Sequence, residues 1–498
     1  MKAPIFMLFF VALWCGVVPL SQAARVSDEV QITTASPEAR SAYQQALILA
    51  NNIRFDDARS LFTHATKLDS QFAMAHYMLA VFAPNEDDGI SHLSTALSLT
   101  DRVTEGERLL IEALHAQFTG SPSRCEELTR TVLQMHPEDV WTRQSLGAFL
   151  VMENRHEEAI AEFERILTIQ PGYPPAWNLL GYANMALGRN EAAETAFKRY
   201  IDALPNEPNP YDSYAEFLMK LGRYDESIRT YEKALTLDKN FHSATVGIAN
   251  DLIHQGHPAA ARLRFQTLYE NAGTTEWKRS ALSGLIRAFV SEGKYERAIA
   301  EAKHLRDISL REKNALQTVG DLQLISALIL ASGSVDPKSG VYLKSPTAEA
   351  RRINQVTVTL HDAYRTLDHA TAPEKTKTRT RMALLTTEIE AAVQENDLVT
   401  ARRKADEYRA WASTSGDPAT LQTAARLRGI IAVAERRYAD ALEDLQQADL
   451  TNPRTLFRLM EVHEALGNTV EARDVRRKIL AVNDGSLQFA MVKRWIAE

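Results

Sequence analysis

Histidine is the residue type whose spacing in this sequence comes nearest to a metal site. His254 and His257 would share one ion only if a single helix continued through both of them. Gly256 lies between them and favours the end of a helix, so we expect solvated turn histidines. His361 and His369 would lie about 12 Å apart along a helix, which is too far for one ion. We therefore expect neither a metal nor a cofactor.

Motifs with a defined catalytic mechanism are missing from the sequence. It contains no HExxH zinc motif, no GxSxG nucleophile turn, no P-loop, no CxxC pair and no dinucleotide fingerprint. An enzyme with a site hidden in residues 306–380 is the alternative from another class. That segment is too short for a catalytic domain of its own. We expect a non-enzymatic protein with no catalytic residues.

The charge of the chain excludes one class of partner. There are 57 Lys and Arg residues against 64 Asp and Glu, a net charge of −7. Lys375, Lys377, Arg379 and Arg381 alternate, so a helix would send successive cations to nearly opposite faces. A basic excess or stripe is the usual signature of nucleic-acid binding. We expect no nucleic-acid partner.

The first residues have the pattern of an export signal. Lys2 precedes an apolar run from Ile5 to Leu20, and small residues stand around Ala23. This pattern predicts a secretory signal peptide over residues 1–23. An uncleaved membrane anchor is the alternative, although Pro19 interrupts the end of the run. We expect an exported protein, periplasmic or extracellular, with no membrane insertion after cleavage. Cys125, the one cysteine then left, should be buried and inert.

Farther along, residue types recur every 34 residues. Small residues in one segment and an aromatic residue in the next return in the same order, as in Gly147 with Phe163 and Gly181 with Phe197. A fixed period of this length is typical of helix–turn–helix units that must stack to bury their apolar faces. The small residues would let paired helices approach closely. Glycines at the turns would adopt the left-handed conformation that ends a helix; they are Gly188, Gly222 and Gly256.

The stretch from Trp177 to Pro205, WNLLGYANMALGRNEAAETAFKRYIDALP, resembles the tetratricopeptide repeat. Looser copies include FDDARSLFTHATKLD, GKYERAIAEAKHL and RRYADALEDLQQADLTNP. The resemblance covers most of the chain in roughly ten units. It implies an all-α, right-handed solenoid of stacked helix pairs.

Two irregular regions interrupt the period. In the first, Thr104 and Glu107 have the spacing of a capping box, which predicts that a helix restarts there. The second, 332–346, is rich in glycine and proline and predicts a loop insertion. The sequence therefore predicts an N-terminal array over 36–331 and a C-terminal array over 347–498. The last segment, from Ser486 to Ala497, would be a helix that caps the final pair.

The resemblance also implies a binding surface. In the family, three positions of each first helix face a concave groove that holds an extended peptide or a partner helix. The alternative is that these are ordinary solvated helix residues. Only Lys220 and Arg287 are basic at these positions, and Asp212 and Glu216 oppose them. This argues against the basic clamp with which the family binds a terminal carboxylate. The candidate binding residues are Asn178, Tyr182, Asp212, Glu216, Lys220, Asn250, His254 and Arg287.

These observations favour a scaffold or adaptor of the cell envelope that binds a protein or peptide partner in its concave groove. A dedicated assembly or regulatory subunit of an envelope polysaccharide or outer-membrane complex is the alternative. No motif identifies the partner or the oligomeric state.

Overall fold

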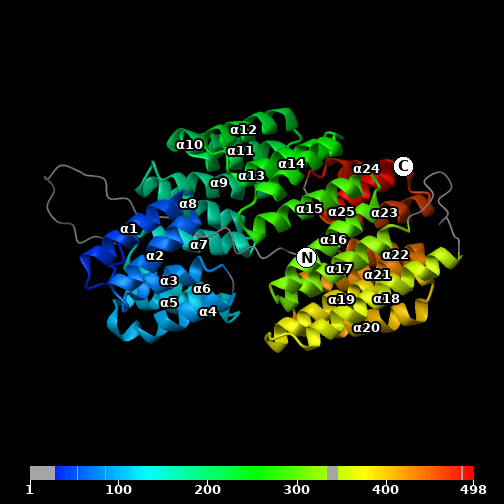
Figure 1. Cartoon of the computed structure of the whole chain (residues 1–498), viewed down its shortest axis with the longest axis horizontal. Helices are drawn as coiled ribbons and strands as arrows, with labels where there is room; N and C mark the ends of the chain where they lie inside the picture. Colours follow the sequence, from blue (N-terminus) through cyan, green and yellow to red (C-terminus); the bar gives the residue numbers. More distant parts are fainter. Residues whose placement is uncertain (1–28, 53, 85, 334–345, 484–485, 498) are drawn as a thin grey trace. The chain divides into compact units, whose positions relative to one another are not determined.

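The computed structural model describes residues 29–52, 54–84, 86–333, 346–483 and 486–497 (Figure 1). The predicted signal peptide and residues 334–345 of the predicted loop lie outside this part, so both stay predictions. Within it the chain forms 25 α-helices and one short 3₁₀ helix, and no strand. The predicted all-α fold is confirmed.

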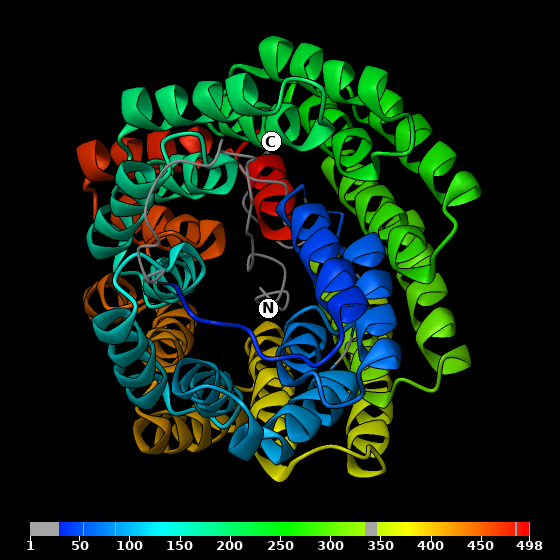
Figure 2. The same ribbon diagram turned by 90° about the vertical axis from the view of Figure 1, so that its left-hand side faces the viewer.

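The helices follow one another as packed pairs. Nearly every helix contacts the helix before it and the helix after it, as a stacked repeat requires. Figure 2 shows this stacking for the blue-to-cyan helices of the first part of the chain. The helices of the first half are α1 (Pro37–Asn51), α2 (Phe55–Leu68), α3 (Ala73–Val81), α4 (Glu86–Ser98), η1 (Thr100–Arg102), α5 (Glu105–Phe118), α6 (Pro122–Met135), α7 (Val140–Met152), α8 (His156–Ile169), α9 (Pro174–Ala186), α10 (Asn190–Ala203), α11 (Pro208–Lys220) and α12 (Tyr224–Leu237).

The second half continues with the same alternation, and its helices are longer from α15 to α21. They are α13 (His242–His254), α14 (Pro258–Asn271), α15 (Thr275–Ser291), α16 (Tyr295–Arg311), α17 (Ala315–Ala331), α18 (Pro346–Asp368), α19 (Glu374–Glu395), α20 (Leu398–Ser415), α21 (Pro418–Ala434), α22 (Tyr438–Gln446), α23 (Pro453–Ala465), α24 (Thr469–Ala481) and α25 (Leu487–Ala497).

By its internal contacts the chain divides into two compact units. Unit 1 is Met1–Phe217 with Thr236–Asp238, and unit 2 is Leu218–Leu235 with Lys239–Glu498. This division falls inside the predicted array of 36–331. The array boundaries drawn from the sequence pattern therefore stay a prediction.

The turn glycines have the predicted backbone conformation. The φ angles of Gly188, Gly222 and Gly256 are 70°, 74° and 81°, in the left-handed region where a side chain costs energy. Four other turns use a residue with a side chain in the same region, which the sequence pattern did not predict. They are Asn154, Lys313, Asn396 and Arg436.

Helical glycines let aromatic rings fill the space between paired helices. A methyl group added at Gly181 would lie 2.7 Å from Cε1 of Phe197, and one at Gly147 would lie 2.4 Å from Cε1 of Phe163. Both predicted pairs are confirmed. On α13, Gly247 lies equally close to the Tyr231 ring.

The predicted capping box begins α5 and has a second role. The Thr104 hydroxyl accepts from the Glu107 backbone N–H, and the Glu107 carboxylate accepts from the Thr104 N–H. The same carboxylate is fully buried and also accepts from the backbone N–H and hydroxyl of Thr33, at 2.7 and 2.6 Å. One glutamate thus starts a helix and anchors the segment that precedes α1.

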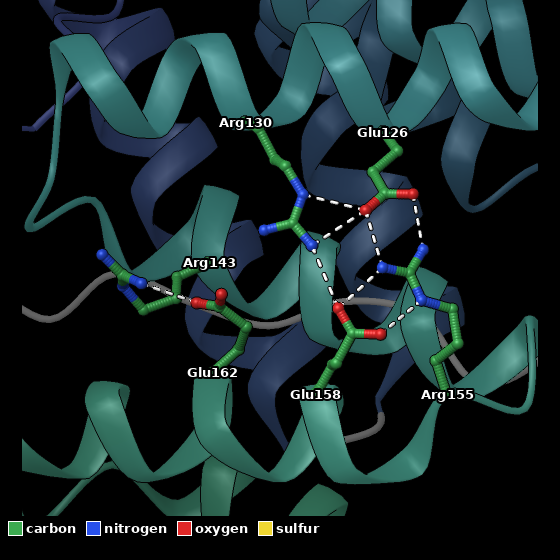
Figure 3. A network of polar contacts seen from close by, with 6 residues as sticks. All are labelled: Glu126, Arg130, Arg143, Arg155, Glu158 and Glu162. Atoms are coloured by element: carbon green, nitrogen blue, oxygen red, sulfur yellow. Dashed lines mark hydrogen bonds and ion pairs between the residues drawn. The ribbon is translucent and has the colours of Figure 1, made fainter.

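Ion pairs join helices of successive repeats in unit 1 (Figure 3). The Arg155 guanidinium, at the start of α8, lies 2.6 Å from carboxylate oxygens of both Glu126 on α6 and Glu158 on α8. Arg130 also contacts Glu126, at 2.8 Å. The Arg155 guanidinium holds the pKa of Glu126 below its usual value. Shared charges of this kind fix the spacing of neighbouring repeats and add modestly to stability.

Cys125 lies in the core of the same unit. It is buried on α6, as predicted, and burial raises the pKa of its thiol to about 11. A thiol with so high a pKa carries little of the reactive thiolate.

Candidate functional site

In unit 1, four predicted binding residues come from two adjacent first helices. Asn178 and Tyr182 lie on α9, and Asp212 and Glu216 lie on α11. The Tyr182 hydroxyl donates to Oε2 of Glu216 at 2.9 Å and so links the two helices. The Tyr182 ring also meets Phe197 edge to face, with 5.2 Å between ring centroids. Tyr182 is therefore part of the core as well as of the candidate site.

Asp212 lies in an environment of low polarity. Burial, followed by the neighbouring Glu216 charge, raises the pKa of Asp212 to about 8. At neutral pH the Asp212 carboxyl is therefore mostly protonated. Burial and the same two acidic residues raise the pKa of Tyr182. A cation brought close to the Asp212 carboxyl would favour its ionisation.

Asn178 adds a buried acceptor to the row. Its side chain is 8% exposed, and no described residue donates a hydrogen bond to its Oδ1. An amide oxygen buried without a donor costs about 1–3 kcal/mol. A partner with a backbone or side-chain N–H could supply that donor.

In unit 2, Asn250 and Arg287 lie on first helices α13 and α15. Nη2 of Arg287 donates to Oδ1 of Asn250 at 3.1 Å, and the guanidinium lies 5.7 Å from the centre of the Phe265 ring. These two predicted residues are thus brought together, and their hydrogen bond links neighbouring repeats.

The other two predicted residues of unit 2 contact the C-terminal segment of the chain itself. The His254 ring stacks on Tyr224 and meets Phe489 of α25, each at 5.3 Å between ring centroids. The Lys220 carbonyl accepts from Nδ2 of Asn483 at 3.2 Å. The expectation that His254 is a solvated turn residue was wrong. It is 8% exposed, because two aromatic rings, Tyr224 and Phe489, pack against its imidazole.

The sequence signal for this contact was present but was interpreted differently. One apolar helix face is indicated by the spacing of Phe489, Val492 and Ile496. The prediction from the sequence is that this helix caps the last pair. In the structure α25 contacts that pair, α23 and α24, and it also contacts α15. Periodicity identifies an apolar face without identifying what it covers.

Metal binding is the other chemistry that His254 and His257 could support. Gly256 breaks the helix between His254 and His257, as predicted. No three His, Cys, Asp or Glu side chains in the part of the chain that the structure describes gather closely enough to hold an ion. None of its helices combines the length and apolarity needed to cross a bilayer.

A histidine pair lies outside the predicted site, between α3 and α4. Nδ1 of His76 lies 3.3 Å from Nδ1 of His92, so one ring must donate and the other accept. His92 also lines a polar hollow of about 370 Å³ with Arg59 and Asp88. Burial lowers the pKa of both imidazoles, and the neighbouring His92 lowers that of His76 further.

This pair predicts a loss of stability in mild acid. A histidine whose pKa is lowered by folding contributes stability above its ordinary value of 6.5, and that contribution is lost as the pH falls below it. His92→Gln keeps a hydrogen-bonding side chain that does not titrate. We expect its melting temperature to fall less than that of wild type between about pH 7 and about pH 5. Exposed His361→Gln is the control and should follow wild type; an equal fall in all three proteins would contradict the assignment.

Sequence comparisons place this architecture among known repeats. Two profiles described as tetratricopeptide repeat match residues 150–216 and 209–241. The general transcriptional corepressor trfA of Dictyostelium discoideum is 22% identical over 26% of this chain and 10% of its own length. The outer membrane protein assembly factor BamD of Caulobacter vibrioides is 24% identical over 36% of this chain and 58% of its own length. The chain thus spans less than two-thirds of either relative.

One solved structure aligns with about half of this chain. A tetratricopeptide repeat protein from Parabacteroides merdae aligns over 51% of this chain and 98% of its own, with 13% identity and a TM-score of 0.35. Each of these similarities covers about half of this chain or less.

Proposed function

Because the chain is a tetratricopeptide repeat protein, we propose that it is a non-enzymatic interaction scaffold of the cell envelope that binds a protein or peptide partner on its first helices. Repeat arrays of this kind present an extended surface on one layer of helices. The predicted export signal and the similarity to an outer membrane protein assembly factor support the envelope location.

One observation carries the binding proposal, namely the buried Asn178 oxygen on α9 together with the partly buried Asp212 and Glu216 on α11. Oδ1 of Asn178 has no donor among the described residues, and Asp212 beside Glu216 is held protonated by burial. A partner segment that presents N–H donors, with a Lys or Arg side chain opposite the carboxyls, would satisfy all of these groups. A buried acceptor without a donor destabilises the free protein, so a partner that supplies the missing hydrogen bond gains binding energy.

The similarity to BamD also favours a second, narrower function. The chain would then be a dedicated subunit of one outer-membrane assembly complex rather than a general adaptor. The two proposals differ in how many partners the same surface captures.

Capture of the partner from envelope extract tests the surface. Tyr182→Phe combined with Glu216→Ala removes a donor and its acceptor together, so that neither is left unpaired. We expect the tagged variant to retain its fold and to lose at least about tenfold of the captured partner, because polar groups central to an interface commonly contribute about 1.4 kcal/mol or more.

The matched control lies on the neighbouring second helix. Thr195→Ala with Arg199→Ala changes two exposed side chains of α10. This control should capture the partner as wild type does. Loss of capture in the control, with normal capture by the first-helix variant, would place the partner on the second helices and contradict the proposal.

A further inference from the structure

The last helix of the chain is inserted against helices that lie far earlier in unit 2. α25 contacts α15 as well as α23 and α24, and Figure 1 shows α25 beside α15 and α23. Asn483, which precedes α25, is also held. Oδ1 of Asn483 accepts from the Tyr224 hydroxyl at 2.6 Å, and its Nδ2 donates to the Lys220 carbonyl.

α25 is buried on two sides. Ala490 and Met491 join the apolar cluster that includes Ile286 of α15, whereas Val492 and Ile496 join the cluster formed by α23 and α24. Each of these four side chains is at most 6% exposed. A cap covers one open end of an array, but this helix fills a space between two sets of helices.

Polar contacts fix the register of the helix. Phe489 lies against the His254 ring, and Nζ of Lys493, one turn later, is 3.4 Å from the His254 carbonyl oxygen. His254 is the last residue of α13, where helix carbonyls lack partners and attract a cation. Arg476 also donates to the Ile496 carbonyl, at 2.9 Å.

α25 cannot form a stable helix without these contacts. It has 11 residues, below the length of about 12–15 residues at which an isolated helix becomes even marginally stable in water. Its formation therefore depends on the helices that it contacts. A competing helix with the same side-chain pattern would meet the same contacts.

We propose that α13, α15 and α23 form a helix-binding groove whose resident occupant is α25, and that an amphipathic partner helix binds there by displacing it. The partner carries an aromatic residue, a branched aliphatic residue three positions later, Lys or Arg at the fourth and a second aliphatic residue at the seventh, as in Phe489, Val492, Lys493 and Ile496. This inference rests on the proposed scaffold function and assigns unit 2 its partner class and its regulation. An intramolecular occupant lowers the apparent affinity for any competitor, because the open groove is only fractionally populated.

A synthetic fluorescent peptide of residues 486–498 tests this inference with the full-length chain. Phe489→Ala combined with Val492→Ala weakens the resident helix and leaves the groove side chains unchanged. We expect this variant to bind the peptide at least about tenfold more tightly than wild type, as measured by anisotropy. A peptide carrying the same two substitutions should not bind. Equal binding of the native peptide by both proteins, or binding by neither, overturns the proposal.

Hydrogen exchange of wild type keeps the proposal testable if that variant fails to fold. Amides of residues 487–496 should exchange well before those of α15, because the resident helix opens without the rest of unit 2. Exchange of both at the same rate overturns the proposal. The peptide assay uses no envelope partner, so the two proposals can fail separately. Failure of peptide binding with normal capture through unit 1 refutes only this inference. Peptide binding as expected, with no effect of the unit 1 variant on capture, refutes only the proposed function.

Discussion

Gly181→Leu is expected to destabilise the protein by about 3 kcal/mol, one of the largest effects of any single substitution in the chain. Even a methyl group at this position would lie within 3.0 Å of three atoms of the Phe197 ring. Phe197 is fully buried, so the ring has no free space into which to move. Overpacking of this kind costs about 1–3 kcal/mol and sometimes more. Thermal unfolding followed by circular dichroism should show a melting temperature roughly 5 °C lower or more.

Gly320→Leu is the matched control, because Gly320 also lies inside a helix. Nothing lies within 4 Å of a methyl group added there. Replacing a helical glycine at an open position should be neutral or slightly stabilising. If Gly181→Leu melted like this control, the close approach of α9 and α10 would be wrong.

Glu390→Gln is expected to cost a further large amount, roughly 3–5 kcal/mol. The Glu390 carboxylate is nearly buried on α19 and lies 2.9 Å from Nη1 of Arg426 and 2.8 Å from Nη2 of Arg454. Removal of its charge leaves two guanidinium groups facing each other with little water. Unfolding by urea at about pH 7 should show this decrease in the free energy of unfolding. The control Glu374→Gln, at an exposed position, should leave the free energy of unfolding unchanged.

The same substitution has a defined pH dependence. The charges of Arg454 and Arg426, opposing the effect of burial, lower the pKa of Glu390 from 4.5 to about 2. Folding therefore favours the ionised carboxylate, whose contribution is fully present above about pH 4.5 and is lost as the pH falls through about 2. The difference in unfolding free energy between wild type and Glu390→Gln should shrink over that interval. A constant difference would show that the carboxylate charge is not what stabilises this site.

The features predicted correctly from the sequence are those with a local cause. A left-handed turn favours glycine, as at Gly188, and a close helix approach requires a small residue opposite Phe197, so both leave a residue type at a fixed position. The capping box of Thr104 and Glu107 likewise spans three residues. Such features recur in register with the 34-residue period and identify the repeat.

Features that depend on distant residues were not predictable in this way. Arg426 and Arg454 converge on Glu390 from two other helices, and no spacing along the chain indicates it. The side-chain environment of His254 depends on Phe489, which lies in the last helix. The candidate binding residues lie on first helices, and their role stays a prediction. The contact of His254 with the C-terminal segment could be seen only in the fold.

Site-specific photocrosslinking in cells tests the central claim most directly. A photoreactive amino acid at Met152, which is 42% exposed on first helix α7, should form a covalent adduct with the partner. The same group at Arg199, exposed on second helix α10, should form none. Adducts from Arg199 without any from Met152 would contradict binding on the first helices.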